Sequence, residues 1–529
     1  MGDYSTRLST NGHLNGIKIN NNEGRQETMS GFWSDKPDTV EGMMLDTNAA
    51  EIDTEEAPEI LSYLPDLRGK DVLEIGSGIG RFTGHLAAAT KSLHTVDFIQ
   101  AFVDKNRENN GHFQHVSFEC NDAMKIHPPS GLTSLDVVFT NWLMMYLSDD
   151  EVQMLAKRVL SWLKVGGYFF VRESCFHPSG NMPRNSGNPT FYRDPSKYCE
   201  LFQVITNENG PLFEGGHEFE LQFATSVKTY IKRKKNPNQI CWLYRKVSRN
   251  APPLQRTQTL QEFLDGDQYT RRGILKYENI YGYNFISVGG PKKAQELLAN
   301  LQLKADEYVL DVGAGVGGSA FLMAKEYGVH VLAMDLSSNM VTIGMQRRVK
   351  ESADSNTSSG RILLDRIAFE ISDINKRDYQ SEAFDCIHSR ETVLHLKDKA
   401  NLLAKFYRWL KPGGRLLMTD YCRGEKAEDS HSREYRKYTQ TRGYYPATVT
   451  EYEKLLRQAG FTQVTAVDRT ADFAAILQEE LTSLQRSERS FINEFSQYEF
   501  DQAIQGWRSK QRFAAEGDMV WGYFLARKE

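Results

Sequence analysis

The stretch YVLDVGAGVGG, at Tyr308–Gly318, decides the fold of this chain, because a near copy, DVLEIGSGIGR, occupies Asp71–Arg81. Each copy is a short apolar, partly β-branched run that carries an acid and opens into a glycine-rich turn. This pattern predicts a buried strand that delivers the following loop to a ligand. Two copies of the pattern predict two domains, each built around one such loop.

The residues around each copy alternate between strand-like runs and helical spacings, which predicts a mostly parallel, doubly wound α/β sheet in each half. A matching turn, WLKVGG at Trp162 and WLKPGG at Trp409, precedes the fifth strand-like run of each half. The second copy is about ten residues longer between its glycine loop and this turn, and the Ser-rich residues 352–360 have the composition of an inserted loop. We therefore interpret the chain as a tandem repeat of one fold.

Composition places the domain boundaries. Residues 1–30 are polar and predict a disordered tail, residues 31–247 a first domain, residues 248–259 with two adjacent prolines a linker, and residues 260–529 a second domain. Residues 32–46 are either a lid over a ligand or a segment that packs on its own domain.

Charge and cysteine content exclude several classes of function. The net charge is −5 over 529 residues, so no strong field favours nucleic acid or an anionic membrane. The six cysteines form no CxxC pair, which argues against a zinc site, any other metal site or a disulfide framework and favours a reducing, cytoplasmic setting. No apolar run reaches the length of a membrane span, and no signal-peptide core is present. The start, MGDYST, matches a myristoylation pattern at Gly2, but no polybasic segment follows, so an untethered tail is favoured.

The glycine loops alone do not identify the ligand. Gly313, Gly315 and Gly318 have the dinucleotide spacing, but Arg81 stands where the first copy needs its third glycine. A nicotinamide cofactor therefore fits one half and not the other.

Acids recur at three matching places, where they can meet an ammonium, a ribose and an adenine. The first precedes the loop, the second ends the second strand, and the third follows the third strand; they are Glu74, Asp97 and Asp122 in the first half and Asp311, Asp335 and Asp373 in the second. With the WLK(V/P)GG turn, both halves resemble class I S-adenosyl-L-methionine-dependent methyltransferases. The resemblance implies two Rossmann-like domains in tandem, each a mostly parallel doubly wound sheet with helical lid elements.

Longer motifs indicate the acceptor. DGDQYTRRGILKYENIYGYNFISVGG, IHSRETVLHL, TDYC and YTQTRGYY resemble phosphoethanolamine N-methyltransferases, while VEGMMLD, TNWLMMYLSD, KVGGYFFVRESCFH and NPTFYRD resemble the first domain of the two-domain, plant-type members. The resemblance covers nearly the whole chain past Met29. It implies methylation of phosphoethanolamine through the mono- and dimethyl forms to phosphocholine, with the first step in the first domain and the later steps in the second. It further implies a monomer acting on small molecules only.

The resemblance assigns roles to residues of the second domain. The catalytic pair would be Tyr269 and His395. The cofactor would be bound by Gln268, Ser287, Asp311, Gly313, Gly315, Asp335, Asp373, Ile374 and Arg390. The phosphobase would be bound by Tyr277, Tyr421, Tyr438, Arg442, Tyr444 and Lys510. Glu391 stands where some family members have Asp, so the carboxylate that faces the amine would be longer by one methylene.

Chemistry supports this set independently. A substrate ammonium with a pKa of roughly 10.4 is protonated at neutral pH, and making it a nucleophile costs about 4–5 kcal/mol. His395, held by the Tyr269 hydroxyl, would either remove that proton or stabilise the neutral amine. Arg442 and Lys510 would hold the phosphate with charge-assisted hydrogen bonds. Tyr438 lies four residues before Arg442, on the same face of a predicted helix.

The first domain differs at the corresponding positions. Tyr146 stands where the second domain has His395, and Asn141 stands where it has Arg390, so no general base is assigned. By resemblance, its cofactor residues would be Glu74, Gly76, Gly78, Arg81, Asp97, Asp122, Ala123 and Asn141. Its phosphobase residues would be Ser174, Ser179, Gly180, Tyr192 and Arg193, with His177 as a further candidate.

Other functions stay open at this point. In one alternative, only one half is catalytic and the other is a regulatory pseudo-methyltransferase. In another, the acceptor is a different small phosphorylated amine. A methyltransferase for protein or nucleic acid, and a binding scaffold without turnover, are further alternatives. The near-neutral charge and the Tyr, Arg and Lys set favour a small phosphorylated acceptor.

Overall fold

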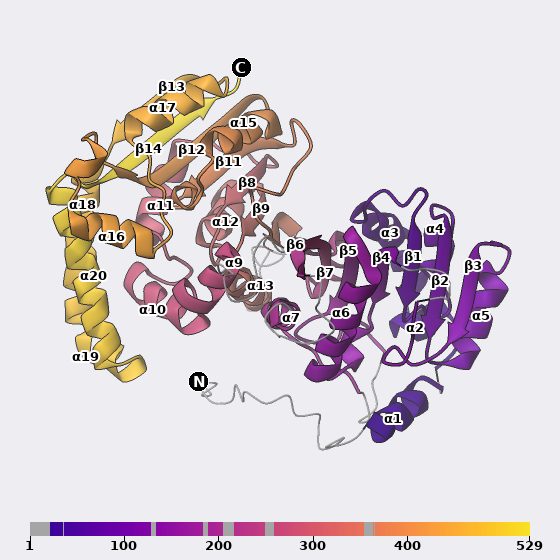
Figure 1. Ribbon diagram of the computed structural model, residues 1–529. Helices are drawn as coiled ribbons and strands as arrows, with labels where there is room; N and C mark the ends of the chain where they lie inside the picture. The colour runs from indigo at the N-terminus through magenta and orange to yellow at the C-terminus, as the bar shows by residue number, and fades with distance from the viewer. Residues whose placement is uncertain are drawn as a thin grey trace. The chain divides into compact units, whose positions relative to one another are not determined.

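The computed structural model describes residues 22–34, 36–128, 134–182, 189–204, 216–248, 259–353, 363 and 365–529. The chain divides into two compact units, Met1–Thr257 (unit 1) and Gln258–Glu529 (unit 2), each built on its own run of strands and helices (Figure 1). The myristoylation pattern lies outside the described residues. So do residues 249–258 of the predicted linker and residues 354–360 of the predicted insertion.

The strands of unit 1 follow the order β3-β2-β1-β4-β5-β7-β6. All run parallel except β7, which is antiparallel to both of its neighbours. Their bounds are β1 (Asp71–Ile75), β2 (Ser92–Asp97), β3 (Val116–Cys120), β4 (Leu135–Asn141), β5 (Leu163–Ser174), β6 (His217–Ser226) and β7 (Gln239–Ser248). The predicted WLKVGG turn is assigned to the start of β5, where Gly166 has a φ of 86° and the register with β4 shifts.

The helices of unit 1 connect these strands. They are α1 (Asn22–Ser34), α2 (Val40–Met44), α3 (Ala49–Ser62), α4 (Thr83–Ala87), α5 (Gln100–Asn110), η1 (Met144–Tyr146), α6 (Asp149–Trp162), α7 (Pro195–Val204) and α8 (Lys228–Lys234). Helix α1 corrects the prediction of a disordered tail over residues 1–30. Residues 22–30 are helical there because Met29 and Trp33 bury apolar surface against Met145 and Tyr146.

Unit 2 repeats this connectivity in the order β10-β9-β8-β11-β12-β14-β13. Again only the last strand of the chain, β14, is antiparallel to its neighbours. The strands are β8 (Tyr308–Val312), β9 (His330–Asp335), β10 (Ile367–Ile371), β11 (Phe384–Arg390), β12 (Leu410–Arg423), β13 (Thr462–Asp468) and β14 (Met519–Arg527). The same connectivity in both units confirms the predicted fold class.

The helices of unit 2 are more numerous than those described in unit 1. Before and between the first five strands lie α9 (Leu260–Phe263), η4 (Leu264–Gln268), α10 (Arg271–Tyr281), α11 (Gly290–Ala299), α12 (Gly318–Leu322), η5 (Met323–Tyr327), α13 (Ser338–Ala353), η6 (Val393–His395) and α15 (Lys399–Trp409). After β12 come η7 (Glu428–Ser430), α16 (Arg433–Thr441), α17 (Val449–Gln458), α18 (Thr470–Arg486), α19 (Glu488–Glu494) and α20 (Gln497–Ala515). Among the described residues, no helix combines the length and the apolar character that a bilayer span requires.

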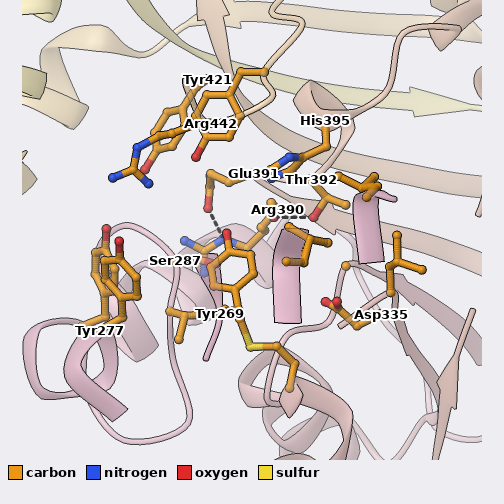
Figure 2. Close-up of a pocket in the computed structure, with 18 of the residues that line it drawn as sticks. Tyr269, Tyr277, Ser287, Asp335, Arg390, Glu391, Thr392, His395, Tyr421 and Arg442 are labelled. Carbon is orange, nitrogen blue, oxygen red and sulfur yellow. Dashed lines mark hydrogen bonds and ion pairs between the residues drawn. The ribbon is translucent and has the colours of Figure 1, made fainter. Parts of the chain in front are cut away.

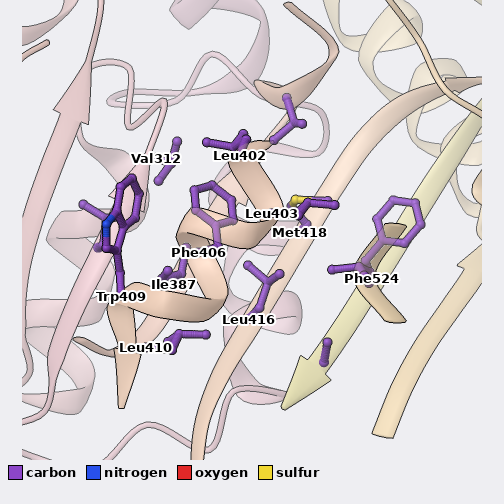
Figure 3. Packing of buried hydrophobic residues seen from close by; sticks show 14 of the residues in the cluster. Val312, Ile387, Leu402, Leu403, Phe406, Trp409, Leu410, Leu416, Met418 and Phe524 are labelled. Carbon is purple, nitrogen blue, oxygen red and sulfur yellow. The ribbon is translucent and has the colours of Figure 1, made fainter. Parts of the chain in front are cut away.

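The core of unit 2 lies between its sheet and α15 (Figure 3). Phe406 and Trp409 of that helix are fully buried against residues of the strands, among them Ile387 and Leu416. Burial of each such side chain contributes about 1.5–3 kcal/mol. This packing fixes the carboxyl ends of the parallel strands at one edge of the sheet, which is where open α/β sheets bind ligands.

Candidate active sites

The glycine loop of unit 2 follows β8 and approaches its neighbours too closely for a side chain. Gly313 has a φ of 70°, and a Cβ there would lie 2.0 Å from Thr392 Oγ1. The backbone N–H of Gly315 donates to Asp335 Oδ2 at 2.9 Å, and that of Ser337 donates to Oδ1 at 2.8 Å. Burial raises the pKa of Asp335 to about 6. Hydrogen bonds thus join the loop and the acid at the end of β9 in one cradle.

A cavity of about 400 Å³ opens from this cradle (Figure 2). It gathers most of the predicted residues of the second domain from helices and strands far apart in sequence. Those that line it are Tyr269, Tyr277, Ser287, Gly313, Asp335, Asp373, Ile374, Arg390, His395, Tyr421, Tyr438, Arg442, Tyr444 and Lys510.

Two buried cations define one part of the cavity. Arg442, at the end of α16, lies 5.0 Å from the ring centroid of Tyr438, and the phenols around it, Tyr438 first, raise its pKa. Lys510 of α20 donates to the Tyr281 hydroxyl at 3.3 Å. Burial and then the charge of Arg442 lower the pKa of Lys510 to about 8. Two cations that repel each other in this way favour an anion between them.

His395 lies in η6, at the carboxyl end of β11. Burial, then the charges of Arg442 and Lys399, lower its pKa to about 4, so its imidazole is neutral at pH 7 and can accept a proton. Its Nδ1 is buried without a hydrogen-bond partner, and its ring meets Tyr444 edge-on with centroids 4.9 Å apart. Within the described part of the chain this Nδ1 is open to accept a hydrogen bond or a proton, although the lowered pKa makes it a weaker base than a free imidazole.

The predicted contact between Tyr269 and His395 is not formed, although both residues are described and line the same cavity. The Tyr269 hydroxyl instead accepts a hydrogen bond from Gln268 Nε2 at 3.1 Å. Burial raises the pKa of Tyr269 well above its ordinary value, which keeps it a neutral donor. Catalytic hydrogen bonds are often long or absent before substrate binds.

Glu391 follows β11 directly and faces the same cavity. Its Oε1 accepts hydrogen bonds from Thr419 Oγ1 at 2.7 Å and Trp521 Nε1 at 3.0 Å. Its Oε2 is buried and has no hydrogen-bond partner among the described residues. Figure 2 shows Glu391 among His395, Tyr269 and Arg442. The motifs IHSRETVLHL and TDYC contain Glu391 and Thr419, but they do not indicate the hydrogen bond between them, and Trp521 lies in no motif. Both bonds depend on the pairing of β12 with β11 and with β14.

Three predicted cofactor residues of unit 2 support the cavity without lining it. Gly315 donates a hydrogen bond to Asp335, and Gln268 donates one to Tyr269, as described above. The carboxylate of Asp311 lies beneath the loop, where Oδ1 lies 2.7 Å from His388 Nδ1. Tyr281, which lies in a quoted motif but was given no role, and Trp507, which lies in no motif, line the cavity in addition. Tyr281 could have been found from its position four residues after Tyr277 on one helix face.

Unit 1 has a smaller cavity of about 130 Å³ at the corresponding edge. The predicted cofactor residues that line it are Glu74, Gly76, Gly78, Arg81, Asp97, Ala123 and Asn141. Asp97 repeats the contacts of Asp335, since Gly78 N donates to Oδ2 at 2.7 Å and Ile99 N to Oδ1 at 3.0 Å. Burial raises the pKa of Glu74 to about 7, against a hydrogen bond from Thr83 at 2.6 Å. Residues of the predicted lid, Trp33 and Met43, also line this cavity.

Arg81 has a structural partner on α3. Its guanidinium forms salt bridges with Asp53 at 2.6 Å and Glu56 at 3.1 Å, and lies 5.2 Å from the ring centroid of Trp142. The residue that replaces the third glycine therefore ties the cofactor loop to the helix ahead of β1.

The predicted phosphobase residues of unit 1, and Asp122, do not line its cavity. The Arg193 guanidinium donates instead to Asp149 and to the backbone carbonyls of Met144 and Leu147, which terminates η1. Ser174 and Ser179 bond each other at 3.0 Å and accept from Gln239. Gly180 packs on backbone, since a Cβ would lie 2.3 Å from Leu45 O, and Asp122 Oδ1 accepts from Met124 N. Tyr192 and His177 also lie outside the cavity, the latter against Asn238.

Sequence comparison then identifies the family. Two family models, both described as a methyltransferase domain, match residues 72–167 and 290–466. The chain is 43% identical over 494 residues to Phosphoethanolamine N-methyltransferase 1 of Arabidopsis thaliana, which covers 93% of this chain and 95% of that relative. The chain belongs to the phosphoethanolamine N-methyltransferase family. This confirms the family predicted from the motifs.

Other members of the family agree. Phosphoethanolamine N-methyltransferase 1 of Triticum aestivum is 41% identical over 511 residues, or 96% of this chain and 98% of the relative. The solved structure of Haemonchus contortus phosphoethanolamine N-methyltransferase 2, in complex with phosphomonomethylethanolamine and S-adenosylhomocysteine, matches with a TM-score of 0.71 at 24% identity. That match covers 90% of this chain and 98% of the other, and it supports the fold of two methyltransferase units in tandem.

Proposed function

We propose that this chain uses S-adenosyl-L-methionine to methylate the nitrogen of phosphoethanolamine three times, yielding phosphocholine. Unit 1 would catalyse the first methylation, and unit 2 would methylate the mono- and dimethyl intermediates. The observation that carries the proposal is the cavity of unit 2. Five buried polar atoms on the residues that line it have no hydrogen-bond partner within the described part of the chain, beside the cations Arg442 and Lys510. They are His395 Nδ1, Glu391 Oε2, the Tyr438 hydroxyl, and Nε and Nη1 of Arg390. Buried polar atoms are normally paired, so these atoms point to a polar ligand.

The charges of this group fit a phosphorylated amine. Arg442 and Lys510 would hold the phosphate, because both are buried and charge-assisted hydrogen bonds to phosphate are strong. Glu391 and the faces of the surrounding tyrosines would hold the ammonium. The phosphate and the nitrogen would then be fixed at opposite ends of one small molecule.

The residues at the strand ends fit the cofactor. The Gly313 loop leaves no room for a side chain and so lets backbone approach the ligand, and Asp335 can accept both ribose hydroxyls. Asp373 and Ile374 line the cavity where the adenine would lie. When bound, S-adenosyl-L-methionine supplies an electrophilic methyl group.

His395 would remove the proton that keeps the acceptor nitrogen from reacting. Its neutral imidazole is available at pH 7, because its pKa is lowered to about 4. The Tyr269 hydroxyl, which stays protonated, would donate a hydrogen bond that orients the imidazole or the amine. In unit 1 the equivalent residue is Tyr146, which lines the cavity, so this position offers a phenol in place of an imidazole.

Matched variants of the full chain test the division between the units. Asp97→Ala and Asp335→Ala remove equivalent acids with equivalent backbone contacts. We expect Asp97→Ala to lower the consumption of phosphoethanolamine by at least about 30-fold while phosphodimethylethanolamine is still methylated, and Asp335→Ala to do the reverse. The loss of all three methylations in one variant, with no loss in the other, would instead support a single catalytic unit and a regulatory pseudo-methyltransferase.

We further propose that the chain acts as a cytoplasmic monomer on these small molecules, without nucleic-acid partners. Sedimentation of the purified chain at micromolar concentration tests the oligomeric state. A dimer at that concentration would contradict the proposal.

A further inference from the structure

Strand registers show which residues of the two units are equivalent around the acceptor end of each site. Asn141 pairs with Arg172 in unit 1, and Arg390 pairs with Thr419 in unit 2. Two residues further along the fifth strands, Ser174 pairs with Gln239 and Tyr421 pairs with Trp521. Trp142 is therefore the equivalent of Glu391, and Gln239 is the equivalent of Trp521.

In unit 2, these two positions form a hydrogen bond in which Trp521 on β14 is the donor and Glu391, directly after β11, accepts. The Trp521 indole and the Thr419 hydroxyl both donate to Oε1 of Glu391, so that oxygen is fixed. Oε2 accepts no hydrogen bond from the described residues and forms only a long ion pair with Arg390 Nε at 3.9 Å. Glu391 has a φ of 48°, a left-handed conformation that is strained for a residue with a side chain.

In unit 1, the same two positions form a hydrogen bond of the opposite direction. Trp142 Nε1 donates to Gln239 Oε1 at 2.7 Å, and Trp142 has the same left-handed conformation, with a φ of 55°. The guanidinium of Arg172, the equivalent of Thr419, lies 3.9 Å from the ring centroid of Trp142 and is buried in a salt bridge with Glu56. This position therefore presents an indole whose face already carries a cation.

We propose that this inverted pair sets the charge that each unit offers to the acceptor nitrogen, and that Trp521 is the positioning residue that aims Glu391. The inference rests on the proposed function and deepens it. A trimethylated ammonium has no N–H to donate, so it is recognised by a fixed carboxylate and by aromatic faces. Unit 2 has both, since Oε2 of Glu391 accepts no hydrogen bond from the described residues, with Arg390 Nε 3.9 Å away, and can face the nitrogen. Unit 1 has neither at this position, because Arg172 occupies the face of Trp142, so it is suited to an ammonium that can still donate hydrogen bonds.

The test compares two ligands that differ only in charge. In 3,3-dimethylbutyl phosphate, a neutral carbon replaces the quaternary nitrogen of phosphocholine. Calorimetry on the full chain gives the ratio of the two affinities, which isolates recognition of the charge from recognition of the phosphate. We expect Trp521→Phe, which keeps a ring but removes the indole donor, to lower the preference for phosphocholine about tenfold. Thr419→Val removes the other donor to the same oxygen and should lower it in the same direction.

Two further variants show whether Trp521 acts through Glu391. Glu391→Gln should lower the preference, and adding Trp521→Phe to it should change the ratio less than twofold. Trp409→Phe is the matched control, since this buried indole also donates to a carboxylate, Asp378 Oδ1 at 2.9 Å, but that carboxylate, unlike Glu391, does not line the cavity. It should leave the ratio unchanged.

An unchanged ratio in both Trp521→Phe and Thr419→Val would overturn the proposal. So would effects of Trp521→Phe and Glu391→Gln that simply multiply, because Trp521 would then act independently of the carboxylate. These binding outcomes are separate from turnover. A wild-type chain that prefers phosphocholine but does not methylate phosphoethanolamine would refute the proposed function and leave the role of Trp521 standing.

Discussion

The two units repeat one cofactor cradle but not one acceptor site. Asp97 and Asp335 receive the same backbone hydrogen bonds from equivalent glycine loops. The residue at the end of the turn after the fourth strand is Tyr146 in one unit and His395 in the other, and the cavities measure about 130 and 400 Å³. The sheet itself positions the glycine loop and the acid of each cofactor site, whereas the residues of the acceptor site come from the segments that connect the strands.

Those connections differ most after the fifth strand of each unit. In unit 2, α16 and α20 lie there and carry Arg442 and Lys510. Among the described residues, the corresponding part of unit 1 contains only the helices α7 and α8. Its predicted phosphobase residue Arg193 donates its hydrogen bonds to Asp149 and to backbone carbonyls. The two repeated sheets thus share a cofactor site, while their phosphobase sites differ.

The largest expected effect concerns the residue that differs most. His395→Ala should lower kcat for phosphodimethylethanolamine by about 10²–10⁴-fold, because it removes the proposed general base of unit 2. Consumption of phosphoethanolamine should fall less than twofold, since unit 1 has Tyr146 at that position. Steady-state kinetics with each acceptor measure both values, and equal losses on both acceptors would contradict the division between the units.

An intermediate effect is expected where the cradles look most alike. Gly313→Ala and Gly76→Ala both place a side chain at positive φ, which costs about 1 kcal/mol or more. Only in unit 2 does the new Cβ clash, since it would lie 2.0 Å from Thr392 Oγ1, whereas in unit 1 the nearest atom is Leu143 Cβ at 3.3 Å.

We therefore expect Gly313→Ala to raise the KM for the cofactor in phosphodimethylethanolamine methylation by about 10–100-fold. Gly76→Ala should raise the cofactor KM in phosphoethanolamine methylation by about fivefold. Similar shifts in both variants would mean that the turn after the fourth strand does not constrain the loop of unit 2 more tightly.

The smallest expected effect is a pH dependence that only unit 2 should show. Burial and Arg442 lower the pKa of Lys510 from its ordinary value to about 8, with Glu480 and Glu391 acting in the opposite direction. A bound phosphate favours the charged lysine, so binding of phosphocholine should take up a proton above pH 8 and none well below it. Its affinity should then fall by up to about tenfold per pH unit above 8 and stay level between pH 6 and 7.5.

Calorimetry in two buffers of different ionisation enthalpy measures this proton uptake. Lys510→Met should abolish it. Proton uptake that persists in Lys510→Met would assign the titration to another group.

The sequence determined the architecture and the chemistry of the cofactor end. The repeat of Tyr308–Gly318 at Asp71–Arg81 predicted two parallel sheets, because a strand that ends in a glycine loop has local signals. The long motifs predicted the family, and they indicated fourteen residues that the structure gathers in one cavity. The helix at Asn22–Ser34 was missed, because its polar composition hides the few apolar residues that pack.

Only the tertiary structure decided which residues act together at the acceptor end. Trp521 and Glu391 are 130 residues apart, and they meet because β14 runs antiparallel beside β12. In unit 1, the equivalent antiparallel pairing of β7 with β5 places Gln239 beside Trp142, and there the residue after the fourth strand is the donor. The direction of a hydrogen bond and the orientation of a carboxylate depend on strand register and on side-chain geometry, which no local pattern encodes. The sequence therefore specified two similar cofactor sites, and the packing of the last strands made their acceptor sites different.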